Sequence, residues 1–295
     1  MKITLEQWHI FKTIVDEGSF ASAAQVMNKS QSGISYAMTQ MAEQLPTPVF
    51  EQQGRKASLT PAGHTLYRHA DALLKQAHCM EALAKDLAQG IESHIAIVAD
   101  ALTPRAPLLQ GLRVFSHECP RTRVKVIEAT LSGTDEALLT GQVQMGIMAR
   151  VPPGFIGDEL TTVKMIPVAA ANHTLAQLSA KGPLSETALK GERQIVISDS
   201  GTKREQNVGW LGAEQRWTFS HFATSTNAVQ AGLGFSFLPE HLIIEQLADN
   251  SLVQLNLQAG GIRSIPLYLV QAAPDYAGPA VKAACNALTK AFKIT

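Results

Sequence analysis

The sequence has few cysteines and no long apolar run, and both scarcities narrow the classes of protein to which the chain can belong. Cys79, Cys119 and Cys285 are far apart and form no CxxC pair or Cys/His cluster. This pattern predicts reduced thiols in a cytoplasmic protein without a structural metal. The N-terminal segment MKITLEQWHIF lacks the apolar core of a signal peptide, and no apolar run approaches membrane-spanning length, so no membrane partner is expected.

An excess of charge of either sign is also missing. The 25 Lys and Arg residues balance the 25 Asp and Glu residues, and the first 90 residues carry eight basic and eight acidic side chains. Bulk charge therefore gives no indication of a nucleic-acid partner. Evidence for such a partner has to come from local pattern.

Catalytic motifs are absent from the sequence as well. There is no GxSxG, no GxGxxG after a strand, no Walker lysine and no HExxH, and the nine histidines are scattered. The sequence therefore predicts no catalytic residue, no cofactor and no metal site. Two function classes stay open at this point: an α/β enzyme with an N-terminal helical passenger domain, and a solute-binding protein, which would need export.

What is present begins with three short helices. Thr4 and Gln7 have the spacing of a capping box, apolar residues then recur at helical intervals, and Gly18 ends the first helix. Ser19 and Ser30 are the expected N-caps of the second and third helices. Two short helices joined by about three residues indicate a helix-turn-helix.

The third helix has an outward face rich in hydroxyl and amide groups. Its apolar residues, Ile34, Met38, Met41 and Leu45, form one stripe, and no acidic residue occurs between Gly18 and Ala42. Hydroxyls and amides both donate and accept hydrogen bonds, as base edges and phosphates require, although a plain solvated helix is the alternative. The predicted DNA-binding residues here are Ser30, Gln31, Ser32, Ser35, Tyr36, Thr39 and Gln40.

The segment VFEQQGRKASLT predicts a β-hairpin after the third helix. A strand begins at Val49, Gln53-Gly54 makes the turn, and residues 57–60 return. Arg55 and Lys56 lie at the tip, where a basic wing suits a phosphate backbone or a minor groove. Ordinary surface charges are the alternative explanation.

A long helix is predicted to follow, from Thr60-Pro61 to Gly90, about 45 Å at 1.5 Å per residue. Its small and apolar residues alternate steps of four and three, which is a heptad seam typical of self-pairing. A dimer would present two recognition helices to one duplex. The predicted dimerisation residues are Leu66, Ala70, Leu73, Ala77, Met80, Ala84 and Leu87.

The first 63 residues resemble the DNA-binding domain of LysR-type transcriptional regulators. The similarity lies in GSF followed by AA, SQSGIS at the start of the third helix, VF in the strand and the closing LTPAG. One departure is Gln52, where the family usually has an arginine. Loss of that arginine removes a phosphate contact, so the phosphate contacts of the wing depend more on Arg55 and Lys56. The resemblance implies an N-terminal all-α winged helix-turn-helix with a long linker helix, a two-lobed periplasmic-binding-protein-like α/β effector domain, and a dimer of dimers.

After Gly90 the pattern changes to strands that alternate with helices, which predicts a parallel sheet with helical crossovers. The expected division is residues 1–62 for the DNA-binding domain, 63–92 for the linker and dimerisation helix, and 93–295 for the effector domain. Within the last, lobe I spans about 93–163 and 265–295, and lobe II about 164–264. The chain is expected to cross between lobes near Lys164 and Ser264.

Ligands of open α/β sheets bind beyond the carboxyl ends of strands and at helix N-termini. That rule selects residues after four strands and residues that cap one further helix, although each Ser or Thr by itself is as readily a helix cap. The predicted effector-binding residues are Ala101, Leu102, Thr103, Leu131, Ser132, Ala149, Arg150, Ser200, Gly201, Thr202, Thr224, Ser225 and Asn227.

The predicted ligand is a small organic acid or a phenolic compound, because Arg150, Lys203 and Arg204 offer positive charge. For Lys203 and Arg204 an ordinary place on the surface is the alternative. The predicted function is that of a LysR-type regulator which binds double-stranded promoter DNA as an oligomer and responds to an unknown effector. RNA polymerase is a candidate partner.

Overall fold

The computed structural model describes residues 2–53, 56–203 and 208–294, and the chain divides into two compact units, Met1–Gln89 and Gly90–Thr295. The first unit contains four helices and one hairpin among its described residues. Their bounds are α1 Leu5–Glu17, α2 Phe20–Val26, α3 Gln31–Gln44, β1 Phe50–Gln53, β2 Lys56–Leu59 and α4 Pro61–Ala88. Within this part of the chain, no helix is long and apolar enough to span a membrane, and the same holds for the described helices of the second unit.

The helix boundaries of the first unit follow from local capping chemistry. The Thr4 hydroxyl accepts from Gln7 N–H while the Gln7 side chain accepts from Thr4 N–H, which completes the capping box. Ser19, Ser30 and Thr60 each cap a following helix. Gly18 ends α1 with a φ of 71°, in the left-handed region that favours glycine.

A small core holds the three short helices and the hairpin together. Ile10, Phe11, Ile34 and Met41 are almost fully buried, and Phe11 makes an edge contact with Phe50 of β1 at 5.5 Å between ring centroids. The stripe expected on α3 therefore faces this core. Strand β2 begins at Lys56, one residue earlier than the sequence predicts.

The second unit is built on one mixed sheet, which in the described residues has nine strands in the order β4-β3-β5-β11-β6-β9-β7-β8, with β10 paired to β6. The strands are β3 His94–Asp100, β4 Arg123–Ala129, β5 Met145–Met148, β6 Gly157–Ala170, β7 Gln194–Ile197, β8 Arg216–Phe219, β9 Phe235–Pro239, β10 Leu252–Gln254 and β11 Arg263–Gln271. The helices are α5 Arg105–Glu118, α6 Ser132–Leu139, α7 Thr174–Ser179, α8 Glu186–Lys190, α9 Phe222–Gln230, α10 Ile244–Ala248 and α11 Pro279–Ile294, with short 3-10 turns at Glu240–Leu242 and Pro274–Tyr276.

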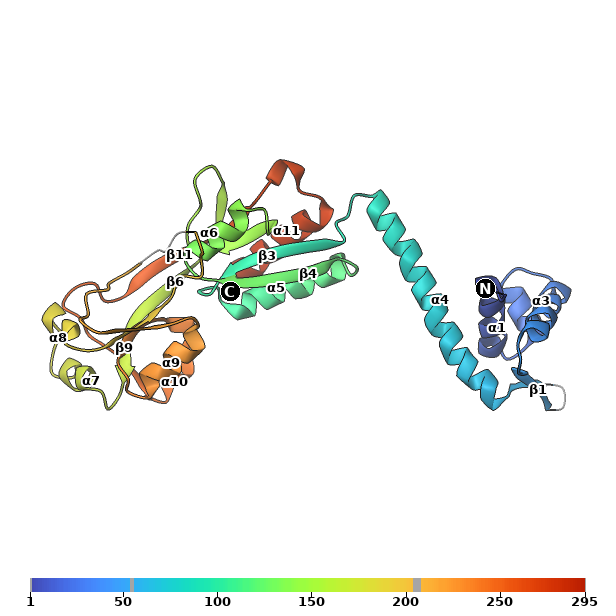
Figure 1. The fold of residues 1–295 in the computed structure, drawn as a ribbon, viewed down its shortest axis with the longest axis horizontal. Coiled ribbons are helices and arrows are strands. Elements are labelled where there is room, and N and C mark those ends of the chain that lie inside the picture. The colour runs from blue at the N-terminus through green and yellow to red at the C-terminus, as the bar shows by residue number, and fades with distance from the viewer. Residues whose placement is uncertain (1, 54–55, 204–207, 295) are drawn as a thin grey trace. The chain divides into compact units, whose positions relative to one another are not determined.

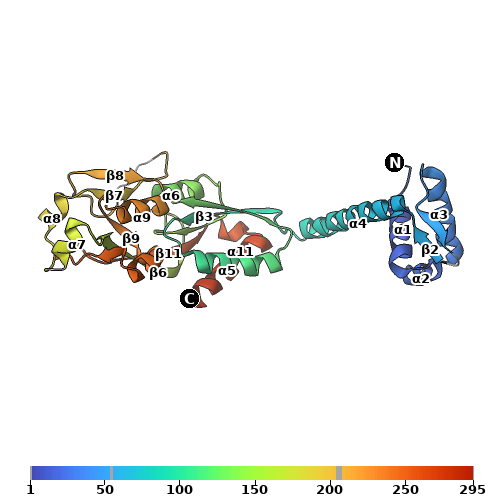
Figure 2. The same ribbon diagram turned by 90° about the horizontal axis from the view of Figure 1, so that it is seen from below.

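Two parallel strand groups lie at opposite ends of this sheet. β3 pairs in parallel with β4 and β5, and β7 pairs in parallel with β8 and β9. The long strands β6 and β11 are antiparallel to each other and connect the two groups, as Figures 1 and 2 show. The predicted parallel pairing is present within each group, and the sheet as a whole is mixed because the chain passes from one group to the other and back through the extended strands β6 and β11.

Helices cover both faces of the first strand group. α5 and α11 pack together on one face, where a Cβ on Gly111 would collide with Leu288, and Phe115 and Leu288 join the core of Ile95 and Ile97 (Figure 1). α6 covers the other face through Ala137 and Leu138. In the register of β6 with β11, Lys164 lies directly opposite Ser264, the two positions at which the sequence suggests that the chain changes lobes.

Candidate functional sites

The outward face of α3 is open to solvent. Ser30, Gln31, Ser32, Ser35 and Thr39 are exposed, Gln40 is half-buried, and Tyr36 is 69% exposed. An exposed tyrosine in the middle of a helix is a large amphipathic side chain with nothing of this unit to cover it. The helix thus presents its predicted reading residues on one accessible surface.

Several of these side chains already hydrogen-bond within the helix. The Ser30 hydroxyl accepts from Gly33 N–H at 3.1 Å, Thr39 Oγ1 donates to the Ser35 carbonyl at 3.0 Å, and Gln40 Nε2 donates to Glu43 at 3.2 Å. No hydrogen bond of the Gln31, Ser35 or Tyr36 side chain to another described residue occurs. These three side chains are therefore the most available to an outside partner.

The hairpin that the sequence predicts as a wing is present as β1 and β2, paired from Phe50 with Leu59 to Gln53 with Lys56. Arg55 lies outside the described residues. Lys56 is the first residue of β2, and the position of its side chain is not described. The predicted phosphate contacts of these two residues stay predictions.

The predicted seam on α4 divides into two parts. Ala70 is buried in the unit's own core and Leu66 packs against it. Beyond them, Leu73, Met80 and Leu87 are 40%, 66% and 55% exposed, Ala84 is exposed and Ala77 is half-buried. Only this second part of the seam is available to another molecule.

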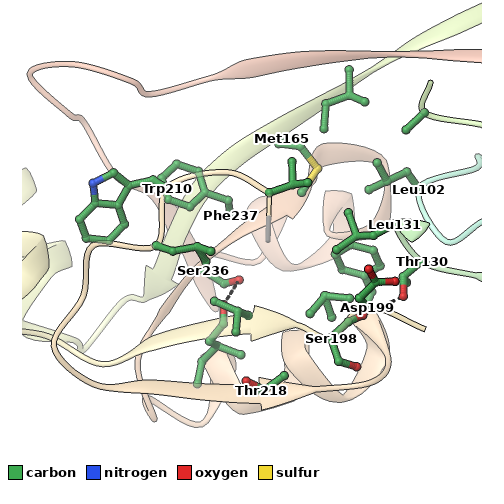
Figure 3. A pocket seen from close by; sticks show the side chains of 18 of the residues that line it. Leu102, Thr130, Leu131, Met165, Ser198, Asp199, Trp210, Thr218, Ser236 and Phe237 are labelled. Atoms are coloured by element: carbon green, nitrogen blue, oxygen red, sulfur yellow. Dashed lines mark hydrogen bonds between the residues drawn. The ribbon is translucent and has the colours of Figure 1, made fainter. Parts of the chain in front are cut away.

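The second unit contains a cavity of about 950 Å³, drawn in Figure 3. Leu102, Thr130 and Leu131 line it from the side of the first strand group, and Trp210, Ser236 and Phe237 line it from the other side. Met165 of β6 and Ile265 of β11 also belong to the wall. The cavity therefore lies between the two strand groups that β6 and β11 connect.

About half of the predicted effector-binding residues line this cavity. They are Leu102, Leu131, Ala149, Arg150, Gly201 and Thr202. The residues that do not line it are Ala101, Thr103, Ser132, Ser200, Thr224, Ser225 and Asn227.

Local structure explains why several of the predicted residues do not line the cavity. Thr103 does not cap a helix, because α5 begins at Arg105 after Pro104, and its buried hydroxyl has no partner among the residues that the structure describes. α9 begins at Phe222, so Thr224, Ser225 and Asn227 lie inside the helix and not at its N-terminus.

Ser132 and Ser200 connect two loops beside the cavity. Ser132 donates from both its N–H and its hydroxyl to Asp199, at 3.0 and 2.7 Å, and Thr130 N–H donates to Ser200 Oγ at 2.8 Å. Gly201 N–H also donates to Asp199. The loops after β4 and β7 are thus joined along one edge of the cavity.

Leu131 has a φ of 52° in the first of these loops. A branched side chain rarely adopts this left-handed conformation, which persists only where the surroundings enforce it. Here the hydroxyl of Thr134 donates to the Leu131 carbonyl at 2.8 Å, and Ser132 N–H donates to the Asp199 carboxylate. Such enforced strain in a cavity wall is typical of a functional position.

The three cations that the sequence predicts as anion ligands are not gathered as free charges in the cavity among the described residues. Arg150 lines the cavity but is ion-paired with Asp135, Lys203 is exposed, and Arg204 lies outside the described residues. The wall also contains four residues that are not predicted from the sequence: Gln194, Trp210, Arg216 and Arg263. These four do not follow the strand-end rule, since three begin strands and Trp210 lies in a connecting segment.

Asp100, the last residue of β3, is a further wall residue that sequence reasoning missed, although it precedes the predicted Ala101. Its carboxyl group is 4% exposed and accepts from Leu102 N–H at 2.9 Å. Burial disfavours the charged form and raises the pKa of Asp100 to about 6, against the smaller opposing effect of the Leu102 hydrogen bond. The cavity wall therefore contains a carboxyl group that titrates close to neutral pH.

Comparisons with known proteins connect both sites to one family. A family model described as "Bacterial regulatory helix-turn-helix protein, lysR family" matches residues 5–64, and one described as "LysR substrate binding domain" matches residues 88–293. The probable HTH-type transcriptional regulator YhaJ of Escherichia coli K12 is 29% identical over 258 residues, which cover 85% of each chain.

Solved structures show the same fold over nearly the whole chain. The Vibrio cholerae virulence activator AphB is 19% identical with a TM-score of 0.52, and the alignment covers 97% of this chain and 99% of AphB. LysG from Corynebacterium glutamicum, solved with bound effector Arg, is 17% identical with a TM-score of 0.51 and 98% coverage of both chains. At these identities the two structures establish the fold alone.

Proposed function

The chain belongs to the LysR family of DNA-binding transcriptional regulators, and we propose that it binds promoter DNA as an oligomer and changes that binding when a small molecule enters the cavity of the second unit. The family confirms the predicted fold class and the predicted regulatory function. It also sets aside the alternatives of an α/β enzyme and an exported solute-binding protein.

The observation that carries the DNA-binding part is the exposed face of α3. Tyr36 is 69% exposed at its centre, Gln31 stands free near its N-terminus, and no acidic side chain lies between Gly18 and Ala42 to repel phosphate. A recognition helix reads bases in the major groove with such side chains. The second family model, a substrate-binding domain, supports the effector part, and the 950 Å³ cavity offers the space.

Replacement of Tyr36 tests the proposed reading surface. We expect Tyr36→Ala to weaken binding to a duplex from the protein's own promoter region by about 1–3 kcal/mol, roughly 5- to 150-fold, because a base contact is lost. Tyr36→Phe separates the hydroxyl from the ring. Gel-shift titrations at fixed salt measure both variants.

Tyr276 provides the matched control, since it is 91% exposed but belongs to the second unit. Tyr276→Ala is expected to bind the duplex like the parent protein. Equal affinity and equal sequence preference for Tyr36→Ala and the parent would argue against α3 as the reading helix.

A further inference from the structure

Arg263, the first residue of β11, is a cation of the cavity wall without a counter-ion in the described part of the chain. A guanidinium group has five N–H donors and no acceptor. No hydrogen bond or ion pair of Arg263 to another described residue occurs, and its Nε is buried without a partner. Arg150, in contrast, is paired with Asp135. The buried Nε of this half-buried arginine thus lacks an acceptor among the described residues, although buried polar groups are normally satisfied.

Neighbouring groups hold the Arg263 guanidinium in place. Its Cζ lies 5.0 Å from the centroid of the Phe237 ring, a cation–π distance. On another side is Gly209, whose φ is 95° and where a Cβ would lie 2.7 Å from Nη2. Burial lowers the pKa of Arg263, since no carboxylate offsets the loss of water. The site is thus pre-positioned for an anion from outside the protein.

Gln194 fixes the segment against which Arg263 rests. This residue is 3% exposed, and its Nε2 donates to the Trp210 carbonyl at 2.7 Å. A carbonyl only accepts, so the amide cannot turn over, and Oε1 is left without a partner. Gln194 therefore holds the backbone next to Gly209 and adds a second unsatisfied polar group to the same wall.

Apolar side chains line the same cavity as Arg263 and Gln194. Phe237, Met165 and Ile265 line the cavity from β9, β6 and β11, and Arg263 pairs with Met165 in the strand register. An apolar ligand body gains free energy by leaving water for such a wall. The donors of Arg263, together with this apolar wall, favour a ligand with one strongly accepting end and an apolar remainder.

We propose that Arg263 binds the carboxylate of a small organic acid whose apolar body lies against Phe237, Met165 and Ile265. This inference rests on the proposed effector-binding function and decides between its two candidate ligand classes. A carboxylate accepts two parallel N–H bonds from the guanidinium fork. A phenol, with an ordinary pKa near 10, is neutral at pH 7 and does not offer that geometry.

Calorimetric titration of the full chain tests the proposal with three pairs of probes of different apolar shape: benzoate and benzamide, cyclohexanecarboxylate and its amide, and hexanoate and its amide, with phenol as a seventh compound. We expect at least one carboxylate to bind roughly tenfold or more tightly than its amide and than phenol. Arg263→Gln is expected to remove that difference, and Arg263→Lys, which keeps the charge but not the fork, to restore part of it.

Arg113→Gln is the control, because Arg113 is an exposed arginine of α5 outside the cavity wall. Three results would overturn the proposal: no carboxylate of the panel binds, amides bind as well as carboxylates, or Arg216→Gln abolishes the carboxylate preference while Arg263→Gln keeps it. Gel shifts on the same variants distinguish failure of the carboxylate assignment from failure of the proposed function. If the parent protein binds its duplex but Arg263→Gln does not change carboxylate binding, only the assignment of the carboxylate to Arg263 is refuted. If the parent protein binds no duplex, the proposed function is refuted.

Discussion

Asp100 combines burial with a titratable group in the wall of the cavity. Folding raises its pKa from 3.8 to about 6. A carboxyl group raised in this way favours the folded state while it is protonated, so its contribution is fully present below pH 3.8 and is lost as the pH rises through about 6. At pH 7 the folded protein therefore holds a buried charge at a cost in stability.

Replacement by asparagine is expected to relieve that cost. Asp100→Asn keeps an acceptor for Leu102 N–H without a charge. We expect it to raise the free energy of unfolding of the second unit at pH 7 by up to about 3 kcal/mol, and by progressively less toward pH 4. Urea titrations in a Trp8→Phe background report on this unit through Trp210 and Trp217.

Asp275→Asn is the matched control, since Asp275 is exposed and lies outside the cavity wall. It is expected to leave the pH dependence of the parent unchanged. The same unfolding free energy for Asp100→Asn and the parent at pH 4 and pH 7 would show that Asp100 is not held in an unfavourable charged state.

The residues missed by sequence reasoning share a cause. The strand-end rule locates Leu102, Leu131 and Gly201 correctly at the cavity, because those positions follow parallel strands. Arg263 and Gln194 begin strands, and they reach the cavity only because β11 and β7 are brought beside β6 and the Trp210 segment. Nothing in the local sequence of either residue indicates that neighbourhood.

At the scale of elements, capping residues and apolar periodicity predict most helix boundaries, whereas a strand without an apolar run is not predicted from the sequence. Capping residues and apolar periodicity predict α1, α2 and α3, and α4 ends at Ala88, close to the expected stop at Gly90. Strand β8, with the sequence RWTF, was not predicted. It is a four-residue edge strand with three exposed side chains, so it lacks the apolar run that identifies buried strands.

Helix α6 and the loop after β7 are joined through one carboxylate. Glu136 accepts from Thr202 Oγ1 at 2.6 Å, from Thr202 N–H at 2.7 Å and from Lys203 N–H at 3.2 Å. The hydrogen bond from the Thr202 hydroxyl is the largest of the effects that lower the pKa of Glu136. A carboxylate with a lowered pKa contributes stability above its ordinary value of 4.5, and this contribution is lost as the pH falls through the lower folded-state value.

Glu136→Gln tests this junction between elements. Glutamine has one acceptor oxygen and turns an N–H₂ group toward the remaining donors, so we expect the amides of Thr202 and Lys203 to exchange with deuterium several-fold faster. Hydrogen-exchange mass spectrometry at pH 7 measures the peptide that contains them. Glu118→Gln, at the exposed end of α5, is the control, and unchanged exchange in Glu136→Gln would mean that other contacts hold the loop.

At the scale of the whole molecule, regulation requires a cavity in one unit to influence a reading helix in the other. A ligand shifts such an equilibrium only by its differential affinity for the two states. The hydrogen bonds that join Ser132 with Asp199 and Glu136 with Thr202 lie across the cavity edge, where a ligand that widens or closes the cavity would change them. We therefore expect these hydrogen bonds to differ between the two states that such a ligand would select.

Oligomerisation is the other prediction at the scale of the whole molecule. It rests on the exposed part of the α4 seam, through which we expect two copies to pair. Met80 is 66% exposed and continues the apolar line from Leu73 to Leu87. In a self-paired helix, Met80→Glu places a buried charge in the contact and brings like charges from the two copies together, which is destabilising. We expect the variant to shift the protein toward monomer in sedimentation equilibrium and to weaken binding to a two-half-site duplex more than to a single half-site.

His78→Glu introduces the same charge on the opposite side of α4, since two residues turn a helix by about 200°. His78 is also exposed, so the substitution is expected to leave both the mass in solution and the half-site preference of the parent unchanged. If the two variants dissociate the oligomer equally, net charge and not the seam controls assembly. If neither does, the copies associate through another surface, and α4 serves only as the support that carries the winged helix.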